Sequence, residues 1–388
     1  MVPKKKVAFF INSLALAGAE KVVATLLDNF YDEYELHLVL LNNIIEVPVN
    51  REKTPVTIID TDRPSEGSKA FDILKIPLLA SRLKNYLRKN KIDVCISFLN
   101  RSNFIAGFAK STGWKGKLIM CERTHTSSVY NNRSLAGKTG RFLVRRLYKN
   151  ADLIITNAIG QTEDLRETYG LKNKIIAIYN PIDLDRQAVK CAEPVTDHTF
   201  SKFTFILSGR FHPQKNHSLL LHAVALIKYL DFDVLLLGRG RDEATVKSLA
   251  SKLGIENKIK FLGFKANPVK YVAAADCTIM SSDYEGFPNV LLESLAAGTP
   301  VISTDCPTGP RELLSGEFKK GFASHAEYLP YGILVPANNP EMLAAEMKNM
   351  LTKPELLKKY AAVSRSRAAD FRLENIIVQF RAALQSLL

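Results

Sequence analysis

Cysteine is scarce in this chain of 388 residues, and its spacing carries no metal or disulfide pattern. The five cysteines are an odd number, lie far apart and never form a C-x-x-C pair. This argues against both a disulfide framework and a zinc site. Three of them, Cys95, Cys121 and Cys277, lie in apolar runs typical of strands, so we expect buried thiols in a reducing cytosol.

Long apolar runs are also missing. No apolar stretch reaches the roughly 18–20 residues that a membrane-spanning helix requires. The N-terminal KKKVAFFINSLALAGA resembles a signal peptide, but Asn12 and Ser13 interrupt its apolar part and Glu20 follows soon after. We therefore favour a buried strand at 6–11 and a helix from Gly18 over the signal-peptide alternative.

Acidic residues are nearly absent from one window of the sequence. Residues 101–150 contain 11 Lys and Arg and a single acid, Glu122, and so contribute +10 to a total net charge of +14. Such an excess points to nucleic acid, anionic membrane or phosphorylated substrates as partners. Nucleic acid is the least favoured of the three, because charge alone suggests it and no recognised motif supports it.

Short apolar runs alternate with helical patterns along the chain. This alternation predicts an α/β fold with parallel sheets covered by helices on both faces. Strands are expected at 6–11, 35–41, 56–59, 92–97, 117–121, 151–155, 174–178, 203–208, 233–237, 258–261, 276–280, 300–303 and 332–335. The clearest helices are expected at 18–29, 71–90, 135–149, 158–169, 216–229, 242–253, 268–274, 289–297 and 340–351.

One polar segment interrupts the alternation. Residues 180–202 contain two prolines and no hydrophobic period. We therefore expect two doubly wound, Rossmann-like domains at 1–182 and 203–388, joined by a linker at 183–202. The last stretch, 355–388, is helical in pattern and could pack on either domain.

Ligands of open α/β sheets bind beyond the carboxyl ends of the strands, so the residues that follow each expected strand are the candidates for a binding site. After the first strand, small residues up to Gly18 open a helix, which suits close approach of an anion. The alternative is that Gly18 only allows close packing of strand and helix. The loop is not a G-x-G-x-x-G, so an NAD site is poorly supported.

Two cations follow the strand at 203–208. Gly209 and Arg210 come directly after it, and Lys215 stands just before the next expected helix. A guanidinium and an ammonium at a sheet edge could together neutralise a diphosphate. Two solvated loop cations are the plain alternative.

The strand at 276–280 leads into an E-G-F-P-N segment. Glu285 closes the loop, Pro288 stands where a helix can begin, and Glu293 lies eight residues after Glu285 inside that helix. A carboxylate here can accept sugar or ribose hydroxyls, while the helix N-terminus favours phosphate. Paired glutamates are common, and the specific signal is the whole strand–EGFPN–helix context.

The basic window contains a histidine and a one-sided helix. His125 follows the strand at 117–121, where it could bind a sugar, although a lone histidine is more often structural. Lys138, Arg141, Arg145 and Lys149 fall within about 80° of one another on the expected helix at 135–149. No acid relieves this stripe, which favours contact with anionic lipid or a lipid diphosphate over an ordinary solvated face.

The segment EGFPNVLLESLAAGTPVIST resembles the donor-site signature of retaining glycosyltransferases of family 4, within glycosyltransferase group 1. That family has the two-domain GT-B fold. The likeness extends to Gly209-Arg210 with Lys215, to the small-residue loop before Glu20 and to NPID at 180–183. It therefore covers nearly the whole chain.

Carried over by position, the resemblance implies that Arg210 and Lys215 hold the donor diphosphate, that Glu285 contacts the transferred sugar and that Glu293 contacts the ribose. The other implied donor-side residues are Gly18, Gly209, Phe264, Lys265, Gly286, Phe287, Pro288, Asn289 and Val290. The basic window, rather than the resemblance, supplies the expected acceptor or membrane side, which contains Arg123 and the stripe Lys138, Arg141, Arg145 and Lys149.

The chain departs from the family pattern at two places. Ala17 stands where the family often has a second glycine, so close approach of a ligand to the first loop is less well supported. Arg123 stands where a histidine often follows Glu122, and His125 comes two residues later. His125 is therefore a weaker catalytic candidate than Glu285, Arg210 and Lys215.

The resemblance implies a retaining glycosyltransferase that moves a hexose or N-acetylhexosamine from a nucleotide-diphosphate sugar, with UDP expected, to a hydroxyl of a glycan. A lipid-diphosphate-linked acceptor in cell-surface polysaccharide or glycan assembly fits the basic stripe. The alternative is a sugar-nucleotide epimerase or hydrolase on the same fold. We expect no metal cofactor and a cytoplasmic enzyme, peripheral on the inner membrane face.

Overall fold

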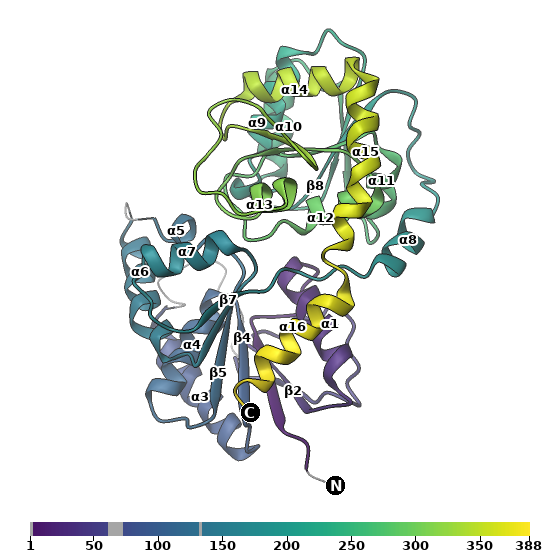
Figure 1. The fold of residues 1–388 in the computed structure, drawn as a ribbon. Coiled ribbons are helices and arrows are strands. Elements are labelled where there is room, and N and C mark those ends of the chain that lie inside the picture. The colour runs from purple at the N-terminus through teal and green to yellow at the C-terminus, as the bar shows by residue number, and fades with distance from the viewer. Residues whose placement is uncertain (1–2, 61–72, 132–133) are drawn as a thin grey trace. The chain divides into compact units, whose positions relative to one another are not determined.

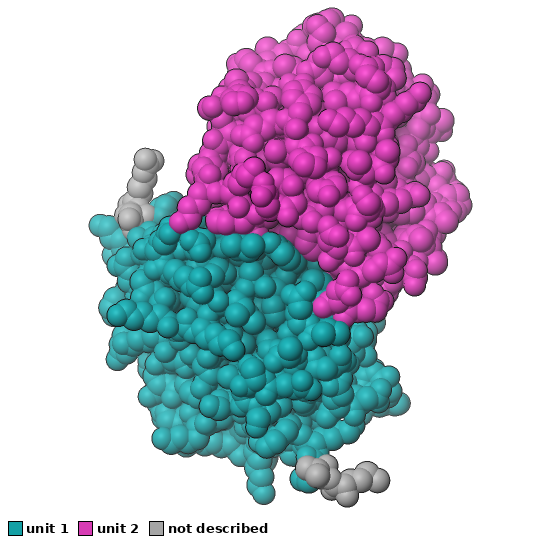
Figure 2. All heavy atoms as spheres, in the orientation of Figure 1, with its two compact units in different colours: residues 1–180, 376–388 teal, residues 181–375 magenta. Residues whose placement is uncertain are grey.

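The computed structural model describes residues 3–60, 73–131 and 134–388 of the chain (Figure 1). It forms two compact units, coloured separately in Figure 2. Unit 1 contains residues 1–180 and 376–388, and unit 2 contains residues 181–375. Each unit is an α/β structure around one sheet, as the alternating pattern predicts.

Among the described residues, unit 1 is built on a seven-stranded parallel sheet in the order β3-β2-β1-β4-β5-β6-β7. The strands are β1 (Lys6–Ile11), β2 (Glu35–Leu40), β3 (Val56–Ile58), β4 (Val94–Phe98), β5 (Lys117–Glu122), β6 (Leu153–Thr156) and β7 (Ile175–Ala177). The direction of winding reverses between β1 and β4, which pair through Val7 and Val94. Such a reversal creates the crevice in which α/β sheets bind ligands.

Helices cover both faces of this sheet. They are α1 (Gly18–Phe30), α3 (Ile76–Lys89), α4 (Asn100–Ser111), α5 (Thr126–Val129), α6 (Leu135–Leu147), α7 (Ile159–Glu167) and the larger part of α16 (Leu373–Gln385), with a 3-10 turn at Tyr148–Asn150. The helices α3, α4 and α6 share one core, which contains Leu83, Ile105 and Val144. The first two residues of the helix expected at 71–90 lie outside the described residues.

Unit 2 repeats the architecture with the order β10-β9-β8-β11-β12-β14-β13. Its strands are β8 (Thr204–Ser208), β9 (Asp233–Leu237), β10 (Ile259–Gly263), β11 (Cys277–Met280), β12 (Val301–Thr304), β13 (Glu327–Leu329) and β14 (Gly332–Val335). Winding reverses between β8 and β11, and β13 alone among these described strands runs antiparallel to its neighbour. The edge strand β13 was not predicted, because its sequence Glu-Tyr-Leu is not an apolar run and none of its three residues is buried.

The helices of unit 2 are α8 (Leu184–Ala192), α9 (His217–Leu226), α10 (Glu243–Lys252), α11 (Val269–Ala274), α12 (Asn289–Ala297), α13 (Pro310–Ser315), α14 (Pro340–Thr352) and α15 (Pro354–Ala369), with a 3-10 turn at Pro213–Lys215. Leu220, Val224 and Met347 join α9 and α14 in a core under the sheet. The predicted strands are all present, with ends within two residues of those expected.

The segment expected to be an irregular linker contains a helix. Asp183 caps α8 by accepting a hydrogen bond from the backbone N–H of Arg186, at 2.9 Å from Oδ1 to N. The helix packs against α11 and α12 inside unit 2. The sequence did not predict this helix because it is polar and shows no apolar stripe; Gln187 alone among its described side chains is buried.

The C-terminal stretch is helical, as expected, and its two helices belong to different units. The helix α15 belongs to unit 2, and residues from Ile376 onward belong to unit 1. There Arg381 forms an ion pair with Glu33, with 2.8 Å between Nη2 and Oε1. None of the helices in the described parts of the chain is long and apolar enough to cross a bilayer.

Candidate active site

The strongest candidate site lies at the carboxyl edge of the sheet in unit 2, after β8 and β11. Lys215 ends the 3-10 turn that follows β8, and its Nζ lies 2.6 Å from Oε1 of Glu285, which follows β11. Glu285 is buried and Lys215 is largely buried. The structure thus brings together two predicted catalytic residues that lie 70 positions apart in the sequence.

Backbone contacts hold the two loops of this pair against each other. Ser281 Oγ donates to the carbonyl of Lys215 at 2.9 Å, and the Asp283 N–H donates to the carbonyl of Gln214 at 2.9 Å. The Gln214 side chain returns a bond of 2.8 Å to the Tyr284 carbonyl. The ion pair is therefore fixed by the frame around it as well as by its own charges.

A left-handed residue closes the first loop. Asn216 has φ of +43°, and its Oδ1 accepts a hydrogen bond from the N–H of Leu219, which caps α9. Its Nδ2 donates to Asp283 Oδ1 at 2.7 Å. Asparagine tolerates this conformation better than most residues, so the sequence L-x-G-R-x-x-P-x-K-N folds into a turn that aims Lys215 back over β11.

The E-G-F-P-N segment is pinned by the loop that follows β12. Thr308 Oγ1 donates to the Glu285 carbonyl at 2.8 Å. A Cβ on Gly309 would lie 2.5 Å from the carbonyl oxygen of Gly286, so the two loops meet backbone to backbone. Phe287 is buried against the ring of Phe371, with 5.2 Å between centroids. This fixes the start of α12 at Asn289, and the positive end of a helix dipole favours an anion there.

A second close approach lies between the loops after β8 and β9. Gly238 has φ of +143°, and a Cβ there would lie 1.9 Å from the carbonyl oxygen of Gly209. A side chain at position 238 would therefore displace the segment that carries Arg210. Arg210 itself is exposed, and its charge opposes the rise that burial produces in the pKa of Tyr284.

The remaining donor-side candidates are arranged less compactly. Phe264 is exposed beside Arg239, whose guanidinium lies 4.8 Å from the ring centroid. Lys265 forms an ion pair of 2.5 Å with Asp197, which also accepts from Tyr271. Glu293 is half-buried in α12.

Gly18 begins α1 and belongs to unit 1, whereas the other donor-side candidates belong to unit 2.

His217 begins α9, is buried, and lies two residues after Lys215, the lysine expected to hold the donor diphosphate. Its ring stacks on Phe211, with 4.6 Å between centroids, and its Nε2 has no hydrogen-bond partner. Burial, and to a lesser degree the charge of Lys215, lowers the pKa of His217 from 6.5 to about 4.

The lowered pKa of His217 predicts that the folded protein loses stability in acid. Above pH 6.5 the imidazole is neutral in both states, but between 6.5 and about 4 the unfolded chain takes up a proton more readily. Unfolding should then become easier by about 2 kcal/mol at pH 5. Denaturant titrations at pH 7.5 and 5 measure the loss of unfolding free energy on acidification, which should be smaller in His217→Phe than in the wild type. The control is His222→Gln, at an exposed position on the same helix, which should show the same loss as the wild type. An equal loss of unfolding free energy in the wild type and in His217→Phe would contradict a role for His217 in acid sensitivity.

In unit 1, Glu122 is fully buried at the end of β5 and accepts several hydrogen bonds. Tyr148 donates its hydroxyl at 2.6 Å, Asn100 donates at 3.0 Å and the Arg123 N–H donates at 3.0 Å. Burial raises the pKa of Glu122, and the hydrogen bonds from Tyr148 and the Arg123 N–H oppose the rise. Glu122 therefore serves as the hub that fixes the carboxyl edge of β5.

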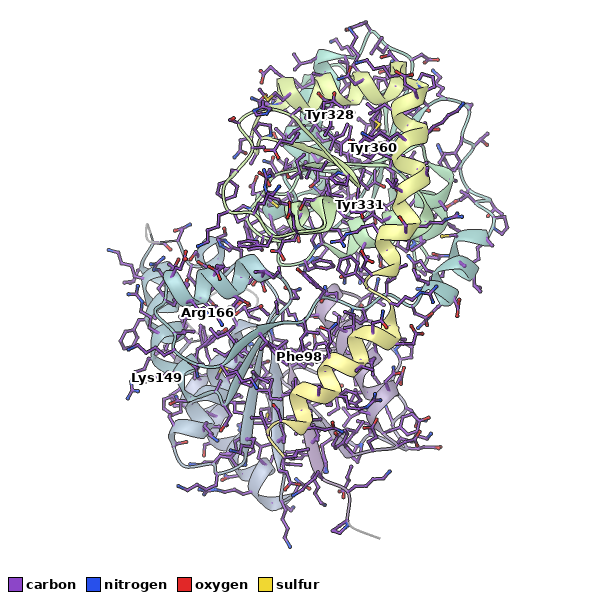
Figure 3. The ribbon with its side chains drawn as sticks, viewed as in Figure 1. Phe98, Lys149, Arg166, Tyr328, Tyr331 and Tyr360 are labelled. Carbon is purple, nitrogen blue, oxygen red and sulfur yellow. The ribbon has the colours of Figure 1, made fainter. Side chains whose placement is uncertain are left out.

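Arg123 was expected on an acceptor or membrane surface, but the structure buries it. Its guanidinium lies 5.1 Å from the ring of Phe98 (labelled in Figure 3) and 5.7 Å from that of Phe380. Its Nη1 donates to Asn180 Oδ1 at 3.1 Å. Arg123 thus links the sheet to both ends of the unit 1 chain, at Asn180 and in α16, and gives no surface charge.

His125 is held by its neighbours on both ring nitrogens. Its Nδ1 lies 2.7 Å from Ser128 Oγ, and its Nε2 lies 3.7 Å from Asp164 Oδ2. Asp164 also accepts from the N–H and hydroxyl of Ser127. Burial lowers the pKa of His125 and Asp164 opposes the shift. This geometry favours a positioning role. No sequence pattern pointed to Asp164, which lies in α7.

Three of the four residues of the basic stripe are exposed. Lys138, Arg145 and Lys149 are exposed, and Figure 3 shows Lys149 at the outer edge of unit 1. Arg141 is half-buried, with its guanidinium 5.3 Å from the ring of Tyr169. Arg146, which was not predicted, is exposed.

Comparisons with known proteins bear on the family. Residues 16–186 match the family described as Glycosyltransferase Family 4, and residues 195–367 match Glycosyl transferases group 1. The chain is 36% identical over 371 residues to N-acetylgalactosamine-N,N'-diacetylbacillosaminyl-diphospho-undecaprenol 4-alpha-N-acetylgalactosaminyltransferase of Campylobacter jejuni, covering 95% of this chain and 96% of that protein. It is 27% identical to another Campylobacter jejuni enzyme, GalNAc-alpha-(1->4)-GalNAc-alpha-(1->3)-diNAcBac-PP-undecaprenol alpha-1,4-N-acetyl-D-galactosaminyltransferase, over 96% of both.

Solved structures confirm the predicted GT-B fold. Anabaena HepE in complex with UDP and glucose has a TM-score of 0.77 at 20% identity, covering 99% of this chain and 100% of that chain. Sucrose-phosphate synthase of Thermosynechococcus elongatus has a TM-score of 0.80 at 17% identity, covering 99% of both. The relatives give no support to an epimerase or hydrolase. The chain belongs to family 4 of the group 1 glycosyltransferases and is a hexosyltransferase with the GT-B fold.

Proposed function

We propose that this enzyme transfers an N-acetylhexosamine from a UDP-sugar to a hydroxyl of a glycan carried on a lipid diphosphate, with retention of configuration. The observation that carries the proposal is the buried Lys215–Glu285 pair at the carboxyl edge of unit 2, 2.6 Å apart. Two relatives named as N-acetylgalactosaminyltransferases for undecaprenol-diphosphate glycans support the choice of sugar and acceptor.

The chemistry requires charge at the leaving group. The bond between the sugar C1 and the diphosphate oxygen breaks, a bond from the acceptor oxygen to C1 forms, and the hydroxyl proton passes to the leaving phosphate. Negative charge grows on the diphosphate, and fixed cations and helix N-termini stabilise it best in a site that excludes water. Lys215, Arg210 and the start of α12 are the groups that would supply this stabilisation.

Lys215 has a second role in this proposal. In the structure its charge is balanced by Glu285. A donor diphosphate provides a competing anion, so binding would shift Lys215 toward phosphate and leave Glu285 able to accept a sugar hydroxyl. Opening a largely buried ion pair is unfavourable unless a new partner replaces the old one, which favours charged donors over free sugars.

We infer that no metal ion is required, because two side-chain cations can neutralise the leaving diphosphate. Transfer in buffer containing EDTA should then proceed at the rate seen with added Mg²⁺ or Mn²⁺, within about twofold. A loss of turnover of tenfold or more that either ion restores would overturn this part of the proposal.

We also propose that the enzyme works in the cytoplasm, peripherally on the inner face of the membrane that holds its acceptor. The exposed cations Lys138, Arg145 and Lys149 support this placement, since basic surfaces are attracted to anionic lipid.

Donor binding provides the direct test of the proposed function. Because a ligand that binds only the native state stabilises it, UDP at 100 times its Kd should raise the free energy of unfolding by about 2.7 kcal/mol. UDP, GDP and free N-acetylgalactosamine should be compared by thermal shift. A shift with UDP, and little with the free sugar, supports the proposal, whereas no shift with either nucleotide contradicts it.

A further inference from the structure

Helix α6 exposes two large apolar side chains on one face. Leu135 is 81% exposed and Phe142 is 63% exposed. They lie seven residues apart, which at 100° per residue places them about 20° apart around the helix. The opposite face is already buried through Val144 and Leu147. This apolar pair has no core role in unit 1 and is available to a partner.

Cations surround the apolar pair. Lys138, Arg145 and Arg146 are exposed and fall within about 60° of Phe142 around the helix. Lys149, also exposed, follows in the 3-10 turn at Tyr148–Asn150. The sequence of α6 contains no acidic residue. In the part of the chain that the structure describes, no ion pair joins any of these four to a carboxylate. Solvated helix faces normally carry mixed charge, so this face is specialised for an anion.

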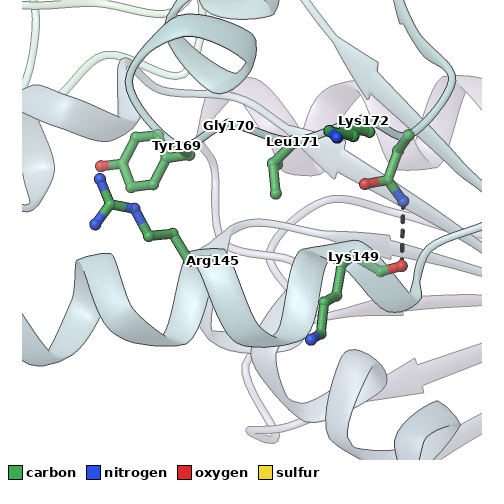
Figure 4. A pocket seen from close by; sticks show the side chains of 7 residues that line it. Arg145, Lys149, Tyr169, Gly170, Leu171 and Lys172 are labelled. Atoms are coloured by element: carbon green, nitrogen blue, oxygen red, sulfur yellow. Dashed lines mark hydrogen bonds between the residues drawn. The ribbon is translucent and has the colours of Figure 1, made fainter.

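The end of α6 also borders a basic hollow of about 430 Å³. In Figure 4, Arg145 and Lys149 extend from the helical segment, and Lys172 extends from the loop opposite. Asn173 holds that loop in place by donating to the carbonyl of Ala151 at 2.7 Å. Three cations around one hollow suit an oxyanion such as a phosphate group.

We propose that Leu135 and Phe142 insert among the lipids of an anionic bilayer, while the surrounding cations contact lipid phosphates, one of them in the hollow beside Lys172. Insertion and charge act together here: each buried apolar side chain favours binding by about tenfold, and each cation by about fivefold. The proposal rests on the proposed membrane location, and it predicts that salt alone will not release the protein.

A single introduced fluorophore tests insertion directly. The chain has one tryptophan, Trp114, which is 4% exposed in the core. Phe142→Trp therefore places a second indole on the proposed surface. With vesicles of phosphatidylglycerol its emission should shift to the blue, because the indole leaves water. The matched control is Phe322→Trp, at a position 67% exposed in unit 2, which should show no shift.

A loss-of-function variant separates insertion from charge. Leu135→Ser with Phe142→Ser should reduce binding to the same vesicles by about 100-fold in sedimentation. Replacing Lys138, Arg145, Arg146 and Lys149 with Gln should abolish the preference for phosphatidylglycerol over phosphatidylcholine. Both variants should keep the thermal shift with UDP, so a loss of that shift would point to the donor site rather than to this surface.

Several outcomes would overturn the proposal. An absent blue shift, an equal shift in Phe322→Trp, or wild-type vesicle binding by the double serine variant would each do so. Complete release of the wild type by 1 M salt would show a purely electrostatic contact. If inorganic diphosphate without lipid produced the same blue shift, a soluble anion rather than the bilayer would be the occupant.

Discussion

Lys215→Ala should lower kcat by about 10²–10³-fold, the usual effect of removing one preorganised group that stabilises charge in a transition state. The reason is geometric: Lys215 is the cation that the structure holds at the carboxyl edge of unit 2, 2.6 Å from buried Glu285. Initial rates at saturating donor and acceptor measure the effect. The affinity for UDP should fall as well, since the same ammonium contacts the diphosphate in both states.

The control must separate lost chemistry from lost stability. Lys215→Ala leaves the Glu285 carboxylate buried without its cation, which is destabilising. Adding Glu285→Gln removes that lone charge, so the double variant should regain stability without regaining turnover. Lys202→Ala removes an exposed cation that pairs with Asp231 in the same unit and should keep wild-type turnover. Wild-type rates in Lys215→Ala would remove this residue from the mechanism.

Gly238→Ala should destabilise unit 2 by about 2–5 kcal/mol and weaken UDP binding at least tenfold. A Cβ at this position would lie 1.9 Å from the carbonyl oxygen of Gly209 and 2.8 Å from its carbonyl carbon, and φ is +143°. Relief of this clash would require the backbone at Gly209 or Gly238 to shift, which would move the loop that carries Arg210. Denaturant unfolding and UDP titration measure the two effects.

A second glycine with positive φ provides the matched control. Gly254 has φ of +62°, and a Cβ there would approach nothing closer than the flexible end of Lys228, at 3.7 Å. Gly254→Ala should therefore cost about 1 kcal/mol for its backbone conformation alone and leave UDP binding intact. Equal effects of the two substitutions would show that backbone strain, rather than the contact with Gly209, explains the loss.

Local patterns were sufficient to predict most of the fold. The strands of both sheets are nearly continuous apolar runs, as expected for strands covered on both faces, and they could be placed to within two residues. The helix α8 was missed because its burial is slight, and β13 was missed because its sequence Glu-Tyr-Leu is not an apolar run. Both elements depend on tertiary neighbours more than on their own sequence.

The donor side could be predicted because its residues follow strand ends in contiguous motifs. Lys215 and Glu285 follow β8 and β11, which are neighbouring parallel strands, so both strand ends lie at one edge of the sheet. The contacts on the acceptor side were harder to predict from the sequence. Asp164 lies 37 positions from Ser127, and Asn180 lies 57 positions from Arg123, so no spacing rule connects them. Charge alone also misplaced Arg123, because cation–π contacts allow a buried guanidinium.

We propose above all that this chain transfers a sugar to a lipid-diphosphate glycan with retention, using the donor site of unit 2. The most direct measurement incubates the purified enzyme with a UDP-N-acetylhexosamine and a glycan-diphosphate-polyprenol acceptor, then determines the anomeric configuration of the product by NMR. We expect one added sugar with the configuration of the donor, formed far more slowly by Lys215→Ala. A product of opposite configuration, or free sugar without transfer, would contradict it.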